Sequence, residues 1–330
     1  MTAPPSSSAR HAATIALALC LAAGTAAAHG DAAAAEPAAD LWWAWSRDPW
    51  VLVPLVLTAL LYAAGSRRLA RESSPAGRRA RRAETVLFWS GWTALVVALA
   101  SPLHPLGEVL FSAHMTQHEV LMLVAAPLLV LARPLPALMW ALPPRWRHVV
   151  GAAARVRGVQ GAWALATMPL VAWLVHAVAL WIWHVPALFE ATLRSDLVHT
   201  LQHAAFLGSA LLFWWALVHG PRDLAGYGAA ILYVFTTSVH SGALGALLTF
   251  ARTVWYPSYE RTASAWGLTA LEDQQLGGLI MWVPAALAYL FAGLALTAGW
   301  LRESHERAQR LQRSRAGMAA GGTATTRTTR

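Results

Sequence analysis

The 330-residue chain contains one cysteine and no lysine, and charged residues make up only 12% of it. A single cysteine, Cys20, excludes an intrachain disulfide and a metal cluster built from cysteines. Soluble proteins of ordinary composition carry about 25% charged residues, roughly twice the fraction found here. The scarcity of charge therefore argues against a soluble protein.

Apolar residues are abundant where charged residues are scarce. The sequence is 57% hydrophobic, contains 18 tryptophans and has a mean hydropathy of +0.45. Apolar runs of about 20 residues recur, and a run of that length crosses a bilayer as a helix. We therefore predict an all-α, polytopic membrane bundle of seven transmembrane helices. The predicted spans are 45–65, 85–100, 111–132, 162–184, 199–219, 226–250 and 276–300.

The N-terminal segment has the pattern of a secretory signal peptide. Arg10 precedes an apolar stretch, and three alanines ending at Ala28 form a small-residue cleavage site. The predicted organisation is a signal peptide at 1–28, a periplasmic linker at 29–44, the membrane domain at 45–300 and a cytoplasmic arginine-rich tail at 301–330.

The arginines predict the orientation of the bundle. Twenty lie in the segments after the first, third, fifth and seventh spans, and only four lie in the segments on the other side. Because basic residues accumulate on the cytoplasmic side, the N-terminus is expected outside and the C-terminus inside the cell. The net charge of +9 is then explained by the orientation of the protein in the membrane. We therefore expect the lipid bilayer as a partner and do not expect binding to nucleic acid.

Histidines are the candidate functional residues. Two pairs are spaced by four residues, so each pair projects from one helical face. The topology brings both pairs and two further histidines to the outer membrane face. These six are His104, His114, His118, His184, His199 and His203. Imidazole is the commonest metal ligand, and ionisable residues inside membranes are usually functional. The cluster indicates a metal site or a proton relay, with a structural polar cap as the alternative.

Nearby residues extend the candidate set. Met115 adjoins His114 and Met122 follows His118 by one turn; imidazole with thioether suits copper, although methionine also serves as ordinary packing. His176 lies about 12 Å below His184 at helical rise, at a depth similar to that of His240. Asp273 opens the seventh span, where a carboxylate caps a helix or orients a histidine ligand.

Three ordered motifs resemble a known family. They are SPLHPLGEVLFSAHMTQHEVLMLVAAPLLVLARP at 101–134, WIWHVPALFEATLRSDLVHTLQH at 181–203 and DQQLGGLIMW at 273–282. The chain from 85 to 300 resembles the CtaG-type cytochrome c oxidase assembly factors, seven-span membrane proteins of bacteria. The resemblance implies a non-enzymatic role in maturing a haem–copper oxidase, with copper as cargo and with oxidase subunits and a periplasmic copper chaperone as partners. The family's histidine positions carry over onto the six histidines named above, whereas Glu119 stands where an apolar residue or methionine is expected.

Other functions remain open on the sequence alone. A b-haem electron carrier could use His176 and His240 as axial ligands. A membrane di-iron hydroxylase would use HxxxH boxes, but the chain has no HxxHH box to accompany them. A copper permease would need a ladder of ligands through the inner half of the bundle, which the sequence does not supply.

Overall fold

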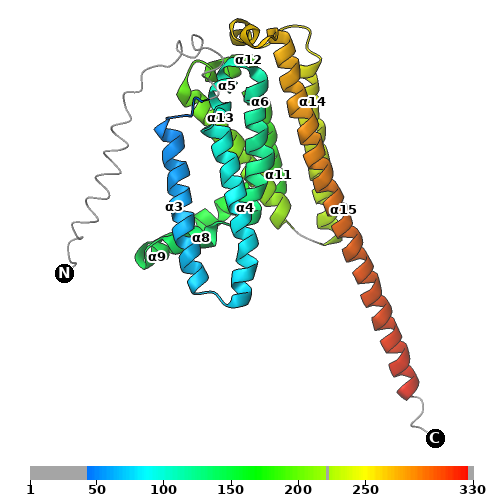
Figure 1. The fold of residues 1–330 in the computed structure, drawn as a ribbon. Helices are drawn as coiled ribbons and strands as arrows, with labels where there is room; N and C mark the ends of the chain where they lie inside the picture. The colour runs from blue at the N-terminus through cyan, green and yellow to red at the C-terminus, as the bar shows by residue number, and fades with distance from the viewer. Residues whose placement is uncertain (1–42, 221–222, 326–330) are drawn as a thin grey trace, which may run out of the picture.

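The computed structural model describes residues 43–220 and 223–325, and every regular element in these ranges is a helix (Figure 1). The predicted all-helical fold is confirmed. The predicted signal peptide and most of the predicted linker lie outside the described residues. Six helical stretches are long and apolar enough to cross a membrane. They are α3 (Pro49–Arg71), α4 (Pro75–Leu99), the composite of α6 (Phe111–Glu119), η2 (Val120–Ala125) and α7 (Ala126–Ala132), α13 (Asp196–His219), α14 (Leu224–Thr249) and α15 (Ala270–Thr325).

The fourth predicted span is not one helix. Residues 162–184 belong to α10 (Arg157–Ala166) and α11 (Pro169–Trp183), whose axes differ by 65°. Pro169 has no N–H to donate and disfavours helical geometry at the residue before it, so the chain bends there. The structure therefore has six potential spans, or seven if the bent pair counts as one.

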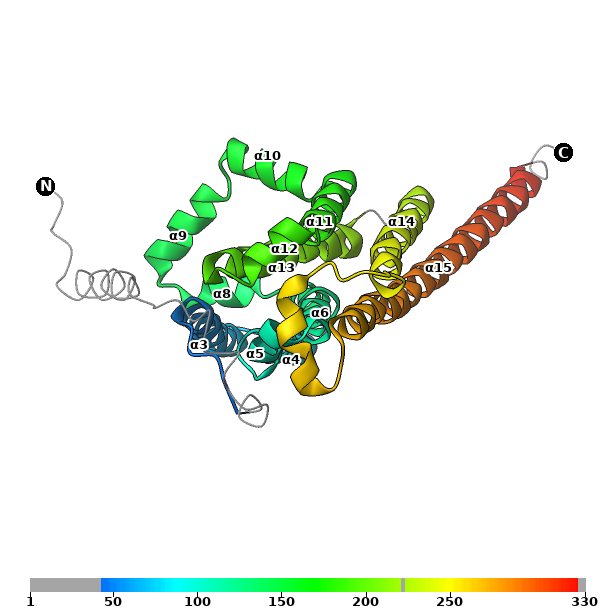
Figure 2. The ribbon, with the colours of Figure 1, turned by 90° about the horizontal axis from the view of Figure 1, so that it is seen from above.

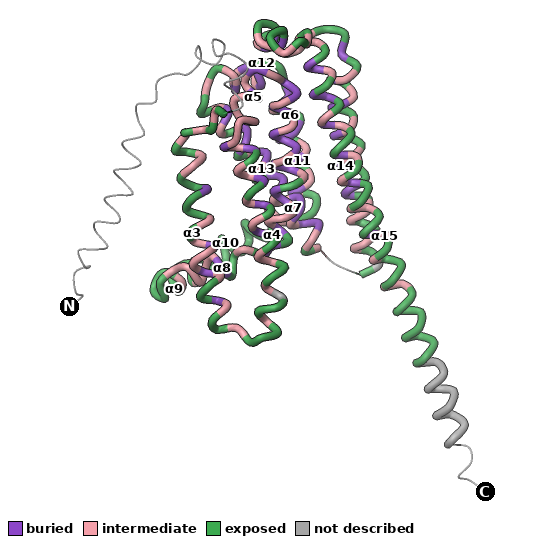
Figure 3. The backbone as a smooth tube through the Cα atoms, viewed as in Figure 1, coloured by how far each residue is buried: buried purple, intermediate pink, exposed green. Residues whose placement is uncertain are grey.

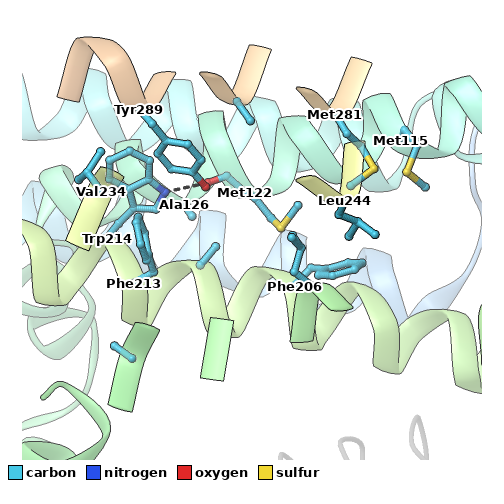
Figure 4. Packing of buried hydrophobic residues seen from close by; sticks show 14 of the residues in the cluster. Met115, Met122, Ala126, Phe206, Phe213, Trp214, Val234, Leu244, Met281 and Tyr289 are labelled. Atoms are coloured by element: carbon cyan, nitrogen blue, oxygen red, sulfur yellow. Dashed lines mark hydrogen bonds between the residues drawn. The ribbon is translucent and has the colours of Figure 1, made fainter. Parts of the chain in front are cut away.

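The third span contains a π-helical turn, η2, directly after His118. Pro127 has no N–H and its ring crowds the carbonyl of the preceding turn, which widens the helix. The N–H of Ala126 accordingly bonds to the carbonyl of Leu121, five residues back. The carbonyl of Met122 instead accepts a hydrogen bond from the indole of Trp214 on α13, at 2.9 Å (Figure 4). This contact fixes α13 against the helix that carries two of the histidines.

The arginine-rich segments that follow the first and third predicted spans are largely helical. Arg67 to Arg82 lie mostly on the ends of α3 and α4, and Ser74 caps α4 by accepting the N–H of Gly77 at 3.2 Å. After α7 the chain forms α8 (Leu135–Ala141), α9 (Pro144–Ala153) and α10, which run across the bundle axis (Figures 1 and 2). A prediction from hydropathy ends each helix where charged residues begin. The helix itself continues until a capping residue or a proline terminates it.

Four short helices gather at the opposite end of the bundle from α8 and α9 (Figure 1). They are α5 (Leu103–Val109), α12 (Pro186–Thr192), η3 (Pro257–Arg261) and η4 (Ala263–Trp266). Figure 3 shows buried residues concentrated on α6, α7, α11 and α13, while the outward side of α3 and the C-terminal part of α15 are exposed. Large apolar side chains such as Leu60 of α3 and Phe235 of α14 are exposed, as expected for surfaces that meet lipid.

Candidate metal centre

The six predicted histidines come together at the end of the bundle where α5 and α12 lie. His104 comes from α5, His114 and His118 from α6, His184 from the C-terminal end of α11, and His199 and His203 from α13. The rings contact one another across these helices. Centroid distances are 5.1 Å for His104–His199, 5.1 Å for His114–His199, 5.5 Å for His118–His203 and 6.3 Å for His118–His184.

Two groups of three histidines within the cluster are close enough together to hold a metal ion, and they share one residue. His104, His199 and His203 form one group, and His114, His118 and His203 form the other. Within each group one ring nitrogen per histidine lies within 4.8 Å of the others. His203 belongs to both, so the two positions overlap at its ring.

Burial differs between the two groups. His114 and His118 are 0% and 1% exposed, whereas the side chain of His104 is 20% exposed. His104 Nε2 also lies 3.8 Å from a carboxylate oxygen of Glu108, which is more exposed still. The first group therefore faces the surface and the second is enclosed by the bundle.

Backbone carbonyls orient two of the rings. His114 Nδ1 donates to the carbonyl of Gly107 at 3.2 Å, and His184 Nδ1 donates to the carbonyl of Leu180 at 2.6 Å. A carbonyl can only accept, so each Nδ1 carries the proton and each neutral ring presents its Nε2 lone pair. Metal-binding histidines in proteins are usually fixed in this manner.

Several nitrogens of the cluster lack any partner. Nε2 of His184, His199 and His203 and both ring nitrogens of His118 are buried without a hydrogen bond. Each such group costs about 1–3 kcal/mol when it is left unsatisfied. A structural polar cap would be expected to satisfy its own members. A bound cation would instead occupy the unpaired Nε2 positions.

Two glutamines support the histidines, and the sequence analysis missed both. Gln117 donates to the carbonyl of Ala98 at 2.5 Å and lies 3.1 Å from His104 Nδ1. Gln202 has its side-chain oxygen 3.1 Å from His114 Nε2, while its own nitrogen is buried without a partner. If the side-chain amide of Gln202 were rotated by 180°, its NH₂ group would donate a hydrogen bond to the Nε2 lone pair of His114. The signal was present, because both histidine pairs read HxxQH.

Asp273 lies near the start of α15 but acts at the start of another helix. It caps a different helix from its own: its carboxylate accepts the N–H of Phe111 at 2.6 Å and that of Ser112 at 3.1 Å, at the start of α6. Gly277 permits this approach, since a Cβ there would lie 2.3 Å from the Phe111 ring. Asp273 thus positions the helix that carries two histidines and does not contact a histidine ring.

The loop between α14 and α15 covers the cluster through two tyrosines. Tyr259 donates to the carbonyl of Gly107 and Tyr256 donates to the carbonyl of His184, both at 2.9 Å. Burial, reinforced by the nearby negative charge of Asp273, raises the pKa of Tyr259 well above its ordinary value, which keeps the hydroxyl a donor. Glu190 on α12 accepts both the N–H and the hydroxyl of Ser258 in the same loop.

The remaining candidates lie outside the two histidine groups. Met115 packs beside Met281 of α15, and Met122 belongs to the same buried apolar cluster (Figure 4). His176 bonds to the hydroxyl of Ser209 at 3.1 Å. His240 packs edge-on to an indole, and neither of its ring nitrogens has a partner.

Glu119, the departure from the family pattern, is buried with one oxygen unpartnered. It is likewise absent from both histidine groups. The carboxylate beside the cluster in sequence therefore adds no ligand atom to either group.

Comparison with known proteins agrees with the motifs. The family model of the cytochrome c oxidase caa3 assembly factor matches residues 60–303. Uncharacterized proteins of Mycobacterium bovis and Mycobacterium tuberculosis are each 28% identical over 283 residues, and one of Mycobacterium leprae is 26% identical over 285 residues. These matches cover 82% of this chain but only 41% of each relative, so the chain spans about two fifths of their length. No solved structure matches. The family match covers most of the chain, and the chain belongs to the cytochrome c oxidase caa3 assembly factor family.

Proposed function

We propose that this protein holds copper at the outer membrane face and passes it to a haem–copper cytochrome c oxidase during assembly. The observation that carries the proposal is the pair of overlapping histidine groups joined at His203. Their buried, unpartnered nitrogens support a cation as the missing partner. The copper is cargo, and the protein acts as a carrier and not as an enzyme.

The donor chemistry favours copper. Both groups consist of imidazoles alone, without a carboxylate or thiolate within them. Imidazole suits copper and zinc, and the Irving–Williams order places copper above zinc at such a site. A membrane di-iron hydroxylase would be expected to add an HxxHH box to its HxxxH boxes, and the chain has none, which makes the di-iron alternative a poorer match.

The shared histidine supplies a route for the cargo. Copper enters at the group that contains the partly exposed His104 and moves to the enclosed group that contains His114 and His118. His203 belongs to both groups, so it remains coordinated to the ion while the other histidine ligands exchange. An oxidase subunit or a periplasmic copper chaperone would meet the exposed position first.

The test compares histidine variants of the purified full chain. His118→Ala and His203→Ala should each weaken copper binding by about 100-fold or more, and the double variant should be little worse, since ligands of one site are not additive. His219→Ala is the matched control, because His219 lies on the same helix as His203, is exposed and is outside the cluster. Additive losses, or equal loss in the control, would contradict a single coupled site.

The cellular test separates assembly from catalysis. A strain that lacks the protein should accumulate oxidase polypeptide with little copper-replete enzyme, and excess external copper should restore part of the activity by mass action. Normal oxidase maturation at limiting copper would refute the assembly role even if the purified protein binds copper.

The delivery route also requires the proposed orientation, with the N-terminus outside and the C-terminus inside a bacterial inner membrane. The distribution of arginines supports it. A reporter that is active only outside the cytoplasm should function when fused after Pro105 and fail when fused after Arg79. The reverse pattern would place the histidines in the cytoplasm and end the delivery proposal.

A further inference from the structure

A cavity of about 450 Å³ opens at the end of the bundle away from the histidines, between α3, α4 and the connection from α7 to α8. Its lining includes the buried, apolar side chains of Leu69, Ala132 and Ala137 and the ring of Tyr62. Its charged lining residues are Arg78, Arg81, Arg82, Arg133 and Glu84. The cavity thus combines apolar walls with a strongly cationic lining.

The arginines are not neutralised by the protein. Four guanidinium groups face a single carboxylate, and in the described part of the chain none of the four forms an ion pair. Arg81 Nε is buried without a hydrogen-bond partner. Guanidinium groups left in this state beside an apolar wall favour an anion, and their planar donors match phosphate oxygens in particular.

The backbone at Arg133 gives an independent indication. Its φ of 47° and ψ of 57° are left-handed, and within residues 43–220 and 223–325 it is the only residue other than glycine with positive φ. Glycine adopts this conformation without steric penalty, so arginine at this position is strained. Backbone strain that persists beside a cavity often marks a functional residue, so it supports a binding role for the Arg133 side chain.

We propose that this cavity binds an anionic phospholipid. The headgroup phosphate lies on Arg81 and Arg133, and the first part of an acyl chain lies along Tyr62 and Leu69. The cavity lies where apolar helices give way to arginine-rich ends, which is the depth of lipid headgroups. A free phosphate would use the arginines but not the apolar wall, so the lipid accounts for both features.

The test measures lipid binding by the purified full chain in neutral detergent, at about 0.15 M salt to screen general surface charge. The probes are phosphatidylglycerol, phosphatidylcholine and inorganic phosphate, with retention followed by native mass spectrometry and protection by thermal unfolding. Phosphatidylglycerol should be retained and should raise the unfolding temperature; the other two probes should not. Arg81→Gln and Arg133→Gly should each weaken retention by about tenfold, because each removes a charge-assisted contact.

Arg133→Gly keeps the test free of misfolding, because glycine suits the left-handed backbone and should leave stability without lipid unchanged or higher. Arg145→Gln is the control: it removes one exposed arginine of α9, outside the cavity. Equal loss in Arg145→Gln would overturn the site in favour of general surface charge. Equal protection by inorganic phosphate would overturn the lipid in favour of a free anion.

Discussion

Replacing Asp273 should damage the histidine cluster from a distance. Its carboxylate is 0% exposed and accepts the first two N–H groups of α6, from Phe111 and Ser112. In Asp273→Ala each of these donors loses its buried acceptor, and an unsatisfied buried donor costs about 1–3 kcal/mol. The favourable interaction of a negative charge with the helix N-terminus is lost as well. We expect a total loss of about 2–7 kcal/mol.

The same change should weaken copper binding. His114 is three residues beyond Phe111, so fraying of the first turn of α6 moves its ring and then that of His118. Loss of a hydrogen bond made directly to a metal ligand typically lowers metal affinity by about 10–100-fold, and because Asp273 acts only through the helix we expect the lower end of this range. Asp273→Asn keeps one neutral acceptor and should lose less of both stability and affinity, which gives a graded series.

Thermal unfolding and copper competition on the purified full chain provide the assay. Glu272→Ala is the matched control, because it removes a carboxylate one residue away that is exposed and bonds only locally, to Thr269. The control should bind copper like the wild type. If Asp273→Ala unfolds at the same temperature as Glu272→Ala, the capping argument is wrong; if it unfolds early but binds copper normally, the link to the histidines is wrong.

Two further changes test other contacts. Tyr259→Phe removes the bond to the Gly107 carbonyl and should cost about 0.5–1.5 kcal/mol, with faster proteolysis of the loop between α14 and α15. Unchanged proteolysis would show that this bond does not hold the loop. Gly65→Ala should destabilise by about 1–3 kcal/mol or more, because its Cβ would lie 1.7 Å from the Ala137 carbonyl oxygen. Gly228→Ala, whose Cβ would meet nothing within 4 Å, should leave the unfolding temperature unchanged or raise it, and equal destabilisation would refute the steric argument.

Hydropathy predicted which segments are apolar, but not how far each helix extends. The third predicted span, 111–132, begins and ends where the composite of α6, η2 and α7 does. By contrast, α3 and α4 continue well into the arginine-rich segment, and the Ser74–Pro75 cap that separates them was readable in the sequence. The bend before Pro169 was also readable, because proline is a local signal that an average over 20 residues conceals.

The grouping of the histidines followed from topology. Four-residue spacing fixed which rings share a helical face, and the order of spans brought these faces to one end. The identity of the supporting residues did not follow. Asp273 reaches α6 only because Gly277 allows two helices to approach closely, and hydropathy does not encode which helices become neighbours.

The backbone carbonyl of Gly107 connects the histidine cluster to the loop between α14 and α15 that covers it. The Gly107 oxygen accepts from His114 Nδ1 at 3.2 Å and from Tyr259 at 2.9 Å, so the loop after α14 and a candidate ligand share an acceptor. Asp273, on the helix that follows the same loop, caps the helix of His114. Displacing α15 would therefore disturb the first turn of α6 and the acceptor of His114 together. Because α15 and α6 lie side by side (Figure 2), a partner that binds against α15 would act on the histidines through these two contacts rather than through the rings themselves.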